Sequence, residues 1–240
     1  ELKFLSGRTK VREHDSRPEW LDLNGDLGFG EGAGFRVALA LDTPRYRGFL
    51  EFESVQAGGS GTSDHDFSYD EGEFKAGIPY ETSVGIYFAR LGLTFKRAFV
   101  DRPSASFGFM IGLEYPRISL GIDQPGARES TSEQYDQFLP VPIVGLEGEL
   151  RITSSLTLSG RAFFGYVKDL PTPFTEGGTL VMSVETFTVE AVLTWQATAA
   201  LRFTLGVGYQ RWAGELHSGE DGNQLTFSAP QITIGLELRW

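Results

Sequence analysis

Hydrophobic and polar residues alternate one by one along most of the chain. The clearest case is the segment 231–240, where Ile232, Ile234 and Leu236 occupy every second position and polar residues or glycine fill the positions between them. Successive side chains of an extended strand point to opposite faces, so this spacing places the apolar groups on one face. The pattern predicts a β-strand with one apolar face and one polar face.

The same alternation recurs over the whole chain and predicts an all-β protein. The predicted strands fall at residues 1–12, 20–29, 35–41, 46–53, 74–99, 107–122, 144–152, 156–166, 187–195, 201–210 and 231–240. Residues 30–34 are rich in glycine and indicate a turn, and 35–53 forms either one long strand with a bulge or two strands with a turn. The apolar parity changes near Ala89 and again at Pro116, and a β-bulge is the ordinary cause of such a change.

The connections between these strands alternate in length. Long polar segments fall at 57–72, 124–137, 168–178 and 217–223, and short turns at 101–104, 153–155 and 196–199. Short turns on one side and longer loops on the other are typical of transmembrane β-barrels, which have an even number of strands in bacterial single chains. The sequence therefore predicts one transmembrane antiparallel up-and-down barrel of about ten strands, with eight or twelve left open.

Composition fits one membrane barrel that extends over residues 1–240. No run of about 18 apolar residues exists, which excludes a transmembrane helix, so any membrane span must consist of strands. The chain has no cysteine, which excludes disulfides, thiolate metal sites and a cysteine nucleophile. The net charge of −11 argues against nucleic acid as a partner. We expect a mature chain whose leader has been removed before Glu1.

Two features resemble a known class of membrane proteins. Strand–turn–strand units such as 144–161, and Trp240 after a run of alternating apolar residues, resemble the small bacterial outer-membrane β-barrels that include OmpA-like and OmpW-like proteins. The resemblance covers nearly the whole length. It implies a Gram-negative outer membrane with periplasmic termini, contact with outer-membrane lipid and lipopolysaccharide, and insertion by the barrel-assembly machinery. It implies no single activity.

Charged residues collect on the face that a barrel turns toward its lumen. The predicted lumen charge network consists of Arg36, Glu51, Glu53, Arg90, Glu114, Glu147, Glu149, Arg151, Arg161, Glu190, Arg202, Glu237 and Arg239. Such residues either pair with one another and fill a narrow barrel or line a path for a small solute. About ten strands favour a filled lumen, because eight leave room only for side chains and sixteen or more leave an aqueous channel.

Aromatic residues near the predicted strand ends suggest membrane-interface girdles. The candidates are Phe29, Tyr46, Phe95, Tyr166, Trp195 and Trp240. A girdle at the level of the lipid headgroups explains them. The alternative is that phenylalanine and tyrosine are simply good strand formers.

Candidate chemistry in the predicted loops is sparse. His14 and Ser16 are spaced like the His-x-Ser pair of lipid A deacylase barrels, but no strand pattern surrounds them. A second loop gathers the acidic residues Asp64, Asp66, Asp70 and Glu71 around His65 without the spacing of a calcium loop. The sequence predicts no catalytic residue, no metal site and no cofactor.

The leading functional hypothesis is a non-enzymatic outer-membrane barrel. Its charge-filled lumen gives it a structural role, or it meets an envelope protein partner through its long acidic loops. The alternatives are a narrow channel for small or hydrophobic solutes, a lipid-modifying enzyme and a soluble lipocalin-like barrel with apolar residues inside.

Overall fold

The computed structural model describes most of the chain. The described residues are 2–4, 6–12, 20–63, 66–69, 72–102, 104–124, 131–135, 140–175, 179–217 and 222–238. Within these ranges no helix is long and apolar enough to cross a membrane.

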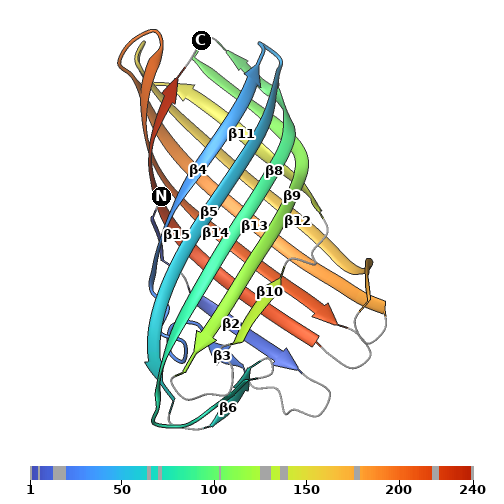
Figure 1. Cartoon of the computed structure of the whole chain (residues 1–240). Coiled ribbons are helices and arrows are strands. Elements are labelled where there is room, and N and C mark those ends of the chain that lie inside the picture. The colour runs from blue at the N-terminus through green and yellow to red at the C-terminus, as the bar shows by residue number, and fades with distance from the viewer. Residues whose placement is uncertain are drawn as a thin grey trace.

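The long strands form one antiparallel sheet that closes into a barrel (Figure 1). Around the barrel they follow the order β1 (Leu2–Phe4), β4 (Glu31–Asp42), β5 (Tyr46–Thr62), β8 (Pro79–Arg102), β9 (Ala105–Asp123), β11 (Val141–Arg151), β12 (Leu156–Thr175), β13 (Thr179–Gln196), β14 (Leu201–His217) and β15 (Gly222–Leu238). Pairing of β1 with β15 closes the ring. β2 (Ser6–Arg12) follows β1 along the same edge of β15, so the ring has ten strand positions when β1 and β2 are counted together. The predicted fold class is confirmed.

Four short strands lie outside this ring. β3 (Leu21–Asp22) pairs with β2, and β10 (Thr131–Tyr135) pairs with β9. β6 (Phe67–Tyr69) and β7 (Gly72–Phe74) form a separate two-stranded sheet near the loop end of the barrel (Figure 1).

Short turns gather at one rim of the barrel, which we call the turn rim. One connects β4 to β5, where the backbone N–H of Thr43 donates to the carbonyl of Tyr46 over 2.8 Å, so residues 35–53 form two strands. The turns predicted at 153–155 and 196–199 are present between β11 and β12 and between β13 and β14. At the opposite end the strands run into the predicted loops, because β5 extends to Thr62 and β12 to Thr175.

Part-way along β8, the apolar residues change from the outer face of the wall to the inner face. Near the turn rim, Leu91 points outward and is exposed while Arg90 points inward and is buried. Toward the loops, the inward Ile86 and Phe88 are buried and the outward Glu81 is exposed. Since β8 pairs with β5 without a break from Pro79 to Phe95, the bulge predicted near Ala89 is wrong.

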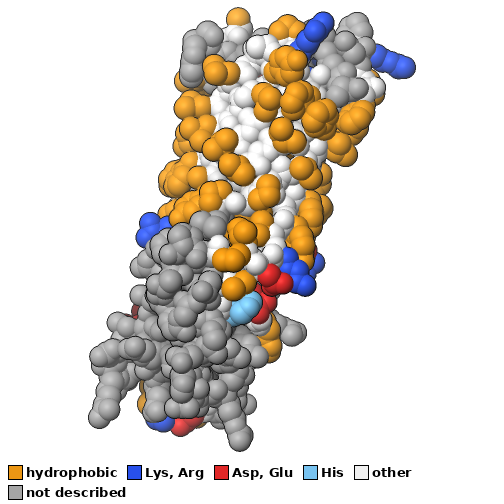
Figure 2. All heavy atoms as spheres, turned by 90° about the vertical axis from the view of Figure 1, so that its right-hand side faces the viewer, with side chains coloured by type: hydrophobic (Ala, Val, Ile, Leu, Met, Phe, Trp, Pro, Cys, Tyr) orange, Lys and Arg blue, Asp and Glu red, His pale blue; other side chains and the backbone are white. Residues whose placement is uncertain are grey.

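The parity change at Pro116 has the same explanation. Tyr115 is exposed on the outer face and Ile118 is fully buried inside, yet β8 and β9 stay paired in one register across Pro116. The same alternate positions point inward along the whole strand. Apolar residues occupy the outward positions near the turn rim and the inward positions toward the loops. Figure 2 shows the result from outside: hydrophobic side chains cover the half near the turn rim, and charged side chains appear below that belt.

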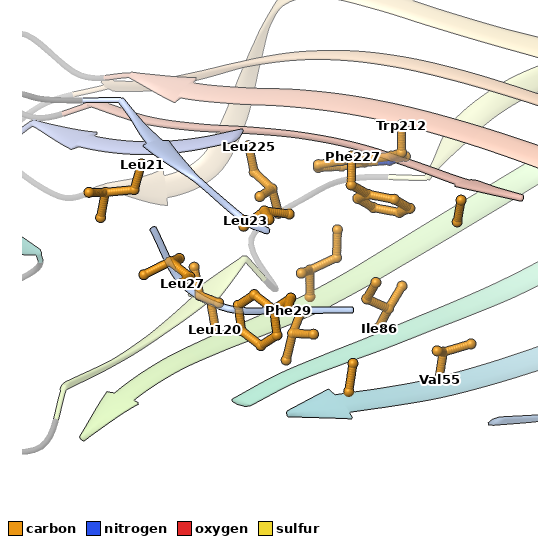
Figure 3. Close-up of a cluster of buried hydrophobic side chains, with 14 of the residues drawn as sticks. Leu21, Leu23, Leu27, Phe29, Val55, Ile86, Leu120, Trp212, Leu225 and Phe227 are labelled. Carbon is orange, nitrogen blue, oxygen red and sulfur yellow. The ribbon is translucent and has the colours of Figure 1, made fainter. Parts of the chain in front are cut away.

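A cluster of apolar side chains fills the loop-side half of the lumen (Figure 3). Residues 20–30, which we call the inner segment, fold into this space rather than forming a wall strand. Leu21, Leu23, Leu27 and Phe29 of the inner segment are at most 4% exposed and pack against side chains such as Leu120 and Phe227 of the wall. Only β3 (Leu21–Asp22) remains of the strand predicted at 20–29, and it is not part of the ring. The turn predicted at 30–34 is wrong, since β4 begins at Glu31.

Local hydrogen bonds explain why the inner segment turns back on itself. The N–H groups of Asp26 and Leu27 both donate to the carbonyl of Asp22, and the Asp22 carboxylate accepts from the N–H of Gly25 over 2.8 Å. Asp and Gly favour such turns because a short carboxylate can satisfy nearby backbone donors. The wall holds the turn in place, because the Thr82 hydroxyl donates to the carbonyl of Leu27 over 2.7 Å.

Candidate functional site

Arg90 lies at the centre of the lumen and contacts three carboxylates. Its side chain is 1% exposed. Nε donates to Oε2 of Glu114 over 2.6 Å, and Nη1 donates to Oε1 of Glu51 over 2.7 Å and to Oε2 of Glu53 over 2.6 Å. The strand alternation explains the convergence, because β5, β8 and β9 are neighbours and each turns these residues inward.

Two further arginines extend this group across the barrel. Arg161 from β12 donates through Nη2 to Glu51 over 2.8 Å and through Nε to Glu190 over 2.7 Å. Arg36 from β4 lies 2.6 Å from Glu190 and 3.6 Å from Glu53, measured from Nη2 to the nearest carboxylate oxygen. The ion pairs therefore join β4, β5, β12 and β13, which lie on different sides of the ring.

Polar residues of the closing strands complete the group. Lys3 from β1 is 1% exposed and contacts both Glu53 and Gln210. Gln231 from β15 donates to Oε1 of Glu190 over 2.7 Å. We call the charged members the central charge layer: Lys3, Arg36, Arg90 and Arg161 with Glu51, Glu53, Glu114 and Glu190.

The central charge layer has equal numbers of cations and carboxylates. A buried charge is costly unless a partner of opposite sign and hydrogen bonds compensate it. Balanced pairing allows these groups to stay inside the barrel in ionised form. On the loop side the layer meets aromatic rings, since the guanidinium carbon of Arg90 lies 4.8 Å from the ring centroid of Phe88 and 5.5 Å from that of Phe163.

Two small cavities lie between the side chains inside the barrel. A cavity of about 10 Å³ lies beside Thr94, Gly108 and Glu147, and a second of about 10 Å³ lies between Leu23, Ile86 and other apolar residues. Each is at the lower limit of the volume that a single water molecule needs. Side chains of the central charge layer and of the apolar cluster occupy the lumen around these two cavities.

A second group of charges lies nearer the turn rim. Arg47 contacts Glu147, and its Nη2 lies 3.1 Å from Glu149 and 3.4 Å from Asp42. The Thr94 hydroxyl donates to Oε2 of Glu147 over 2.7 Å. Arg47 and Glu149 are more exposed than the residues of the central charge layer, so they lie nearer the opening of the barrel at this rim.

The predicted lumen residues separate into four sets. Seven of them, Arg36, Glu51, Glu53, Arg90, Glu114, Arg161 and Glu190, belong to the central charge layer, and Glu147 and Glu149 lie with Arg47 nearer the turn rim. Arg202 and Glu237 lie 3.7 Å apart between β14 and β15. Arg151 is exposed at the end of β11, and its role as a lumen residue stays a prediction. Arg239 lies outside the described residues.

The sequence reasoning missed several residues of this site. Lys3 was overlooked although it stands between Leu2 and Phe4 in the first alternating segment. Arg47 shares the parity of Glu51, which was the available signal for its inward direction. Gln210 and Gln231 carry no charge, so a search for charged residues does not find them.

The predicted girdle residues are only partly on the outer surface. Tyr46, Tyr166 and Trp195 are exposed there, and the Phe95 ring stacks on Phe109 with centroids 4.5 Å apart. Phe29 is instead 2% exposed within the inner segment, so its prediction as an interface residue is wrong. Trp240 lies outside the described residues.

The candidate loop chemistry falls mostly outside the described residues. His14, Ser16, Asp64, His65, Asp70 and Glu71 all belong to that part of the chain. Asp66 is described, and its carboxylate lies 3.1 Å from the Lys75 ammonium group at the surface.

Comparison with solved structures supports the membrane assignment of the fold. The outer-membrane protease OmpT from Escherichia coli matches with a TM-score of 0.54 and 13% sequence identity, covering 100% of this chain and 94% of that one. The fold is that of an outer-membrane β-barrel. The transport unit of the autotransporter AIDA-I from Escherichia coli also matches, with a TM-score of 0.41, 6% identity and coverage of 100% and 89%. No protein-family description and no curated protein matches the chain.

The comparison corrects the expectation that this protein is not an enzyme. That expectation rested on the scarcity of catalytic motifs, but the barrel that matches with a TM-score of 0.54 is a protease. The architecture is therefore compatible with catalysis, and the exclusion is withdrawn. At 13% identity the likeness shows the fold and assigns no activity to this chain. The narrower resemblance to OmpA-like and OmpW-like proteins stays a prediction.

Proposed function

We propose that this protein is an outer-membrane barrel with a sealed lumen, which anchors a rigid extension of its own wall at the cell surface. The central charge layer carries this proposal, because its ion pairs cross the barrel from β5 to β12 and from β12 to β13. The extension is the loop-side half of the strands, whose outer face is polar and whose interior is a packed apolar core.

The direction of the barrel in the membrane follows from its two ends. Short turns are typical of the periplasmic end and long connections of the outside. The turn rim and Leu238 then lie on the periplasmic side, and the extension reaches the lipopolysaccharide and possible envelope protein partners. The lipid-facing belt ends near Tyr115 on β9, where the next outward residue is Arg117.

Conductance in planar lipid bilayers tests the sealed lumen. We expect the purified wild-type barrel to insert without producing current steps, because the central charge layer blocks ion flow. A variant with Arg161→Ala and Glu190→Ala removes one cation and one carboxylate together, so it opens space without unbalancing the charge. We expect current steps from this variant.

A matched control removes an ion pair from the outer surface. Arg211 and Glu185 lie 3.8 Å apart there and are both exposed. A variant with Arg211→Ala and Glu185→Ala should remain as silent as the wild type. Stable single-channel steps from the wild-type protein would contradict the proposal and favour the narrow solute channel.

A further inference from the structure

The lumen of the loop-side half is apolar, unlike the rest of the barrel interior. Membrane barrels commonly have a polar interior, and the central charge layer follows that pattern. On the loop side of this layer the inward residues of β8, β9 and β15 are apolar: Ile86, Phe88, Ile118, Leu120, Leu225 and Phe227. We call the space that these residues surround the loop-side chamber.

The inner segment occupies the loop-side chamber without being a strand of the ring. Figure 3 shows Leu23 of this segment between Leu225 on one side and Ile86 on the other, and all three line one cavity. The turn has hydrogen bonds of its own, since Asn24 Nδ2 donates to the carbonyl of Phe29 over 2.6 Å. The segment can therefore leave the wall and keep these internal bonds.

Two hydroxyl groups of β8 hold the inner segment against the wall. Tyr80 donates to the carbonyl of Asp26, and Thr82 donates to that of Leu27. Water can replace both interactions when the segment moves away, so their net contribution is small. The apolar packing is also incomplete, because a cavity of about 10 Å³ lies beside Leu23.

Buried polar groups separate the loop-side chamber from the central charge layer. The inward residues of β13 run from Glu190 of that layer through Thr188 and Thr186 to Val184 of the apolar cluster, and Gln210 of β14 lies opposite Thr188. Thr186, Thr188 and Gln210 are at most 2% exposed. In the described part of the chain, the two hydroxyls and Gln210 Nε2 have no hydrogen-bond partner. Such groups are unfavourable for folding, so they point to a ligand that bonds to them.

The surroundings define the chemistry of that ligand. An apolar body suits the rings of Phe88, Trp212 and Phe227. A hydroxyl group suits the polar end, because it can accept from Gln210 Nε2 and donate to a threonine oxygen. The ligand is uncharged, because the cations and carboxylates of the central charge layer already balance and an added charge would lack a counterion.

We propose that the loop-side chamber binds a small uncharged molecule with an apolar body and one hydroxyl group, which displaces the inner segment. The hydroxyl end meets Thr188 and Gln210, and the apolar body takes the place of Leu23 and its neighbours. The chamber lies on the loop side of the central charge layer. Binding therefore needs no path through the barrel and does not depend on whether the lumen is sealed.

Two probes of nearly equal size test the polar end of the site. p-Cresol and toluene differ by one hydroxyl group, and isothermal titration calorimetry of the protein in lipid nanodiscs, corrected with empty nanodiscs, measures their binding. In a purely apolar pocket the hydroxyl group lowers affinity, because it loses its hydrogen bonds to water. We expect saturable binding of both probes, with p-cresol bound at least as tightly as toluene.

Thr188→Val removes a hydroxyl group of the proposed site and keeps the shape of the side chain. It should weaken p-cresol binding about fivefold, the usual value of one hydrogen bond, and leave toluene binding unchanged. The unliganded protein should lose no stability. Thr204→Val is the matched control, since Thr204 also points inward on β14 but lies on the turn-rim side of the central charge layer. It should change the binding of neither probe.

Limited proteolysis tests the displacement of the inner segment. We expect saturating p-cresol to increase cleavage within residues 20–30 while the barrel keeps its SDS-resistant mobility. Gly28→Ala, whose Cβ would meet backbone of β5, favours the displaced state. It should bind p-cresol at least about fivefold more tightly, because more molecules have the chamber open. Gly30→Ala, which has open space at its Cβ, should bind p-cresol as the wild type does.

Four outcomes would overturn the proposal. Tighter binding of toluene than of p-cresol, or equal effects of Thr188→Val and Thr204→Val, would mean that the buried polar groups do not contact the ligand. Equal heats from protein-containing and empty nanodiscs would mean that the chamber binds neither probe. Saturable binding with the inner segment still protected would show that the ligand does not replace it. None of these results changes the conductance of the wild-type barrel, so the two proposals fail separately.

Discussion

Arg90 pairs with three carboxylates inside the barrel. It is buried against Glu51, Glu53 and Glu114. The net free energy of its ion pairs is small compared with the cost of removing the arginine, because removal leaves buried carboxylates without that cation. Glu114 would lose its ion pair with Arg90, and Glu51 and Glu53 would each lose one of their cations, in a low-dielectric interior.

We therefore expect Arg90→Met to destabilise the barrel by about 3–5 kcal/mol, the usual cost of removing one partner from a buried ion pair. Urea unfolding of the protein in lipid vesicles, followed by tryptophan fluorescence, measures the change. Arg211→Met is the matched control, since Arg211 lies on the polar outer surface, and it should change stability by less than about 0.5 kcal/mol. Equal effects of the two substitutions would mean that the central charge layer is not a structural seal.

Gly28 allows the inner segment to approach the wall closely. Gly28 has a φ of 67°, in the region that favours glycine, and a Cβ placed on it would lie 2.2 Å from the carbonyl oxygen of Ser60 on β5. The atom that this Cβ would meet belongs to the backbone of β5, so no side chain can rotate to make room for it. Gly30, two residues later, has open space at the same position.

This contrast gives a prediction for the inner segment alone. Gly28→Ala should displace the segment from the apolar core at a cost of more than about 1 kcal/mol, whereas Gly30→Ala should leave it docked. Limited proteolysis measures the difference: we expect new cleavage within residues 20–30 of the Gly28 variant, while its barrel keeps its SDS-resistant mobility. If both variants are cut at the wild-type rate, the segment does not depend on this contact.

The barrel as a whole is longer than its lipid-facing belt. Along the outer face of β15, Ile234 and Leu236 belong to the belt, and Thr226 and Ser228 belong to the extension beyond it. A charged substitution on the outer face of β15 should therefore be destabilising within the belt and tolerated within the extension.

Leu236→Arg should lower stability by about 2–4 kcal/mol if the side chain lies near the bilayer midplane, because arginine is costly on a lipid-facing surface. Thr226→Arg has the same outward direction and should be tolerated. Folding into vesicles, measured by the fraction of SDS-resistant protein, compares the two. Normal folding of Leu236→Arg together with failure of Thr226→Arg would reverse our assignment of belt and extension.

Sequence periodicity was sufficient for the fold class but not for the inner segment. The period of two and the alternating loop lengths predicted the barrel and its approximate strand number. Leu21, Leu23, Leu27 and Phe29 show the same parity that a wall strand would show. Their placement inside the barrel depends on contacts with distant residues such as Thr82, which local periodicity does not contain.

The reversal of the two faces was also hidden from the sequence. Ile86 and Leu91 differ in parity, and either a bulge or a change of surroundings produces that difference. Only the continuous register of β5 and β8 distinguishes the two causes. For the central charge layer, alternation indicated the inward direction of Glu51 and Arg161, but their pairing depends on the curvature of the closed ring, which brings distant strands face to face.

The packed interior of the extension affects the order in which the barrel can form. In the proposed orientation, this half of each strand crosses the bilayer before Phe88, Trp212 and Phe227 can meet the inner segment. Burial of a large apolar side chain contributes about 1.5–3 kcal/mol, and this contribution is gained only after crossing. In that orientation, assembly of the core stabilises the strands after they have crossed the membrane and opposes their return.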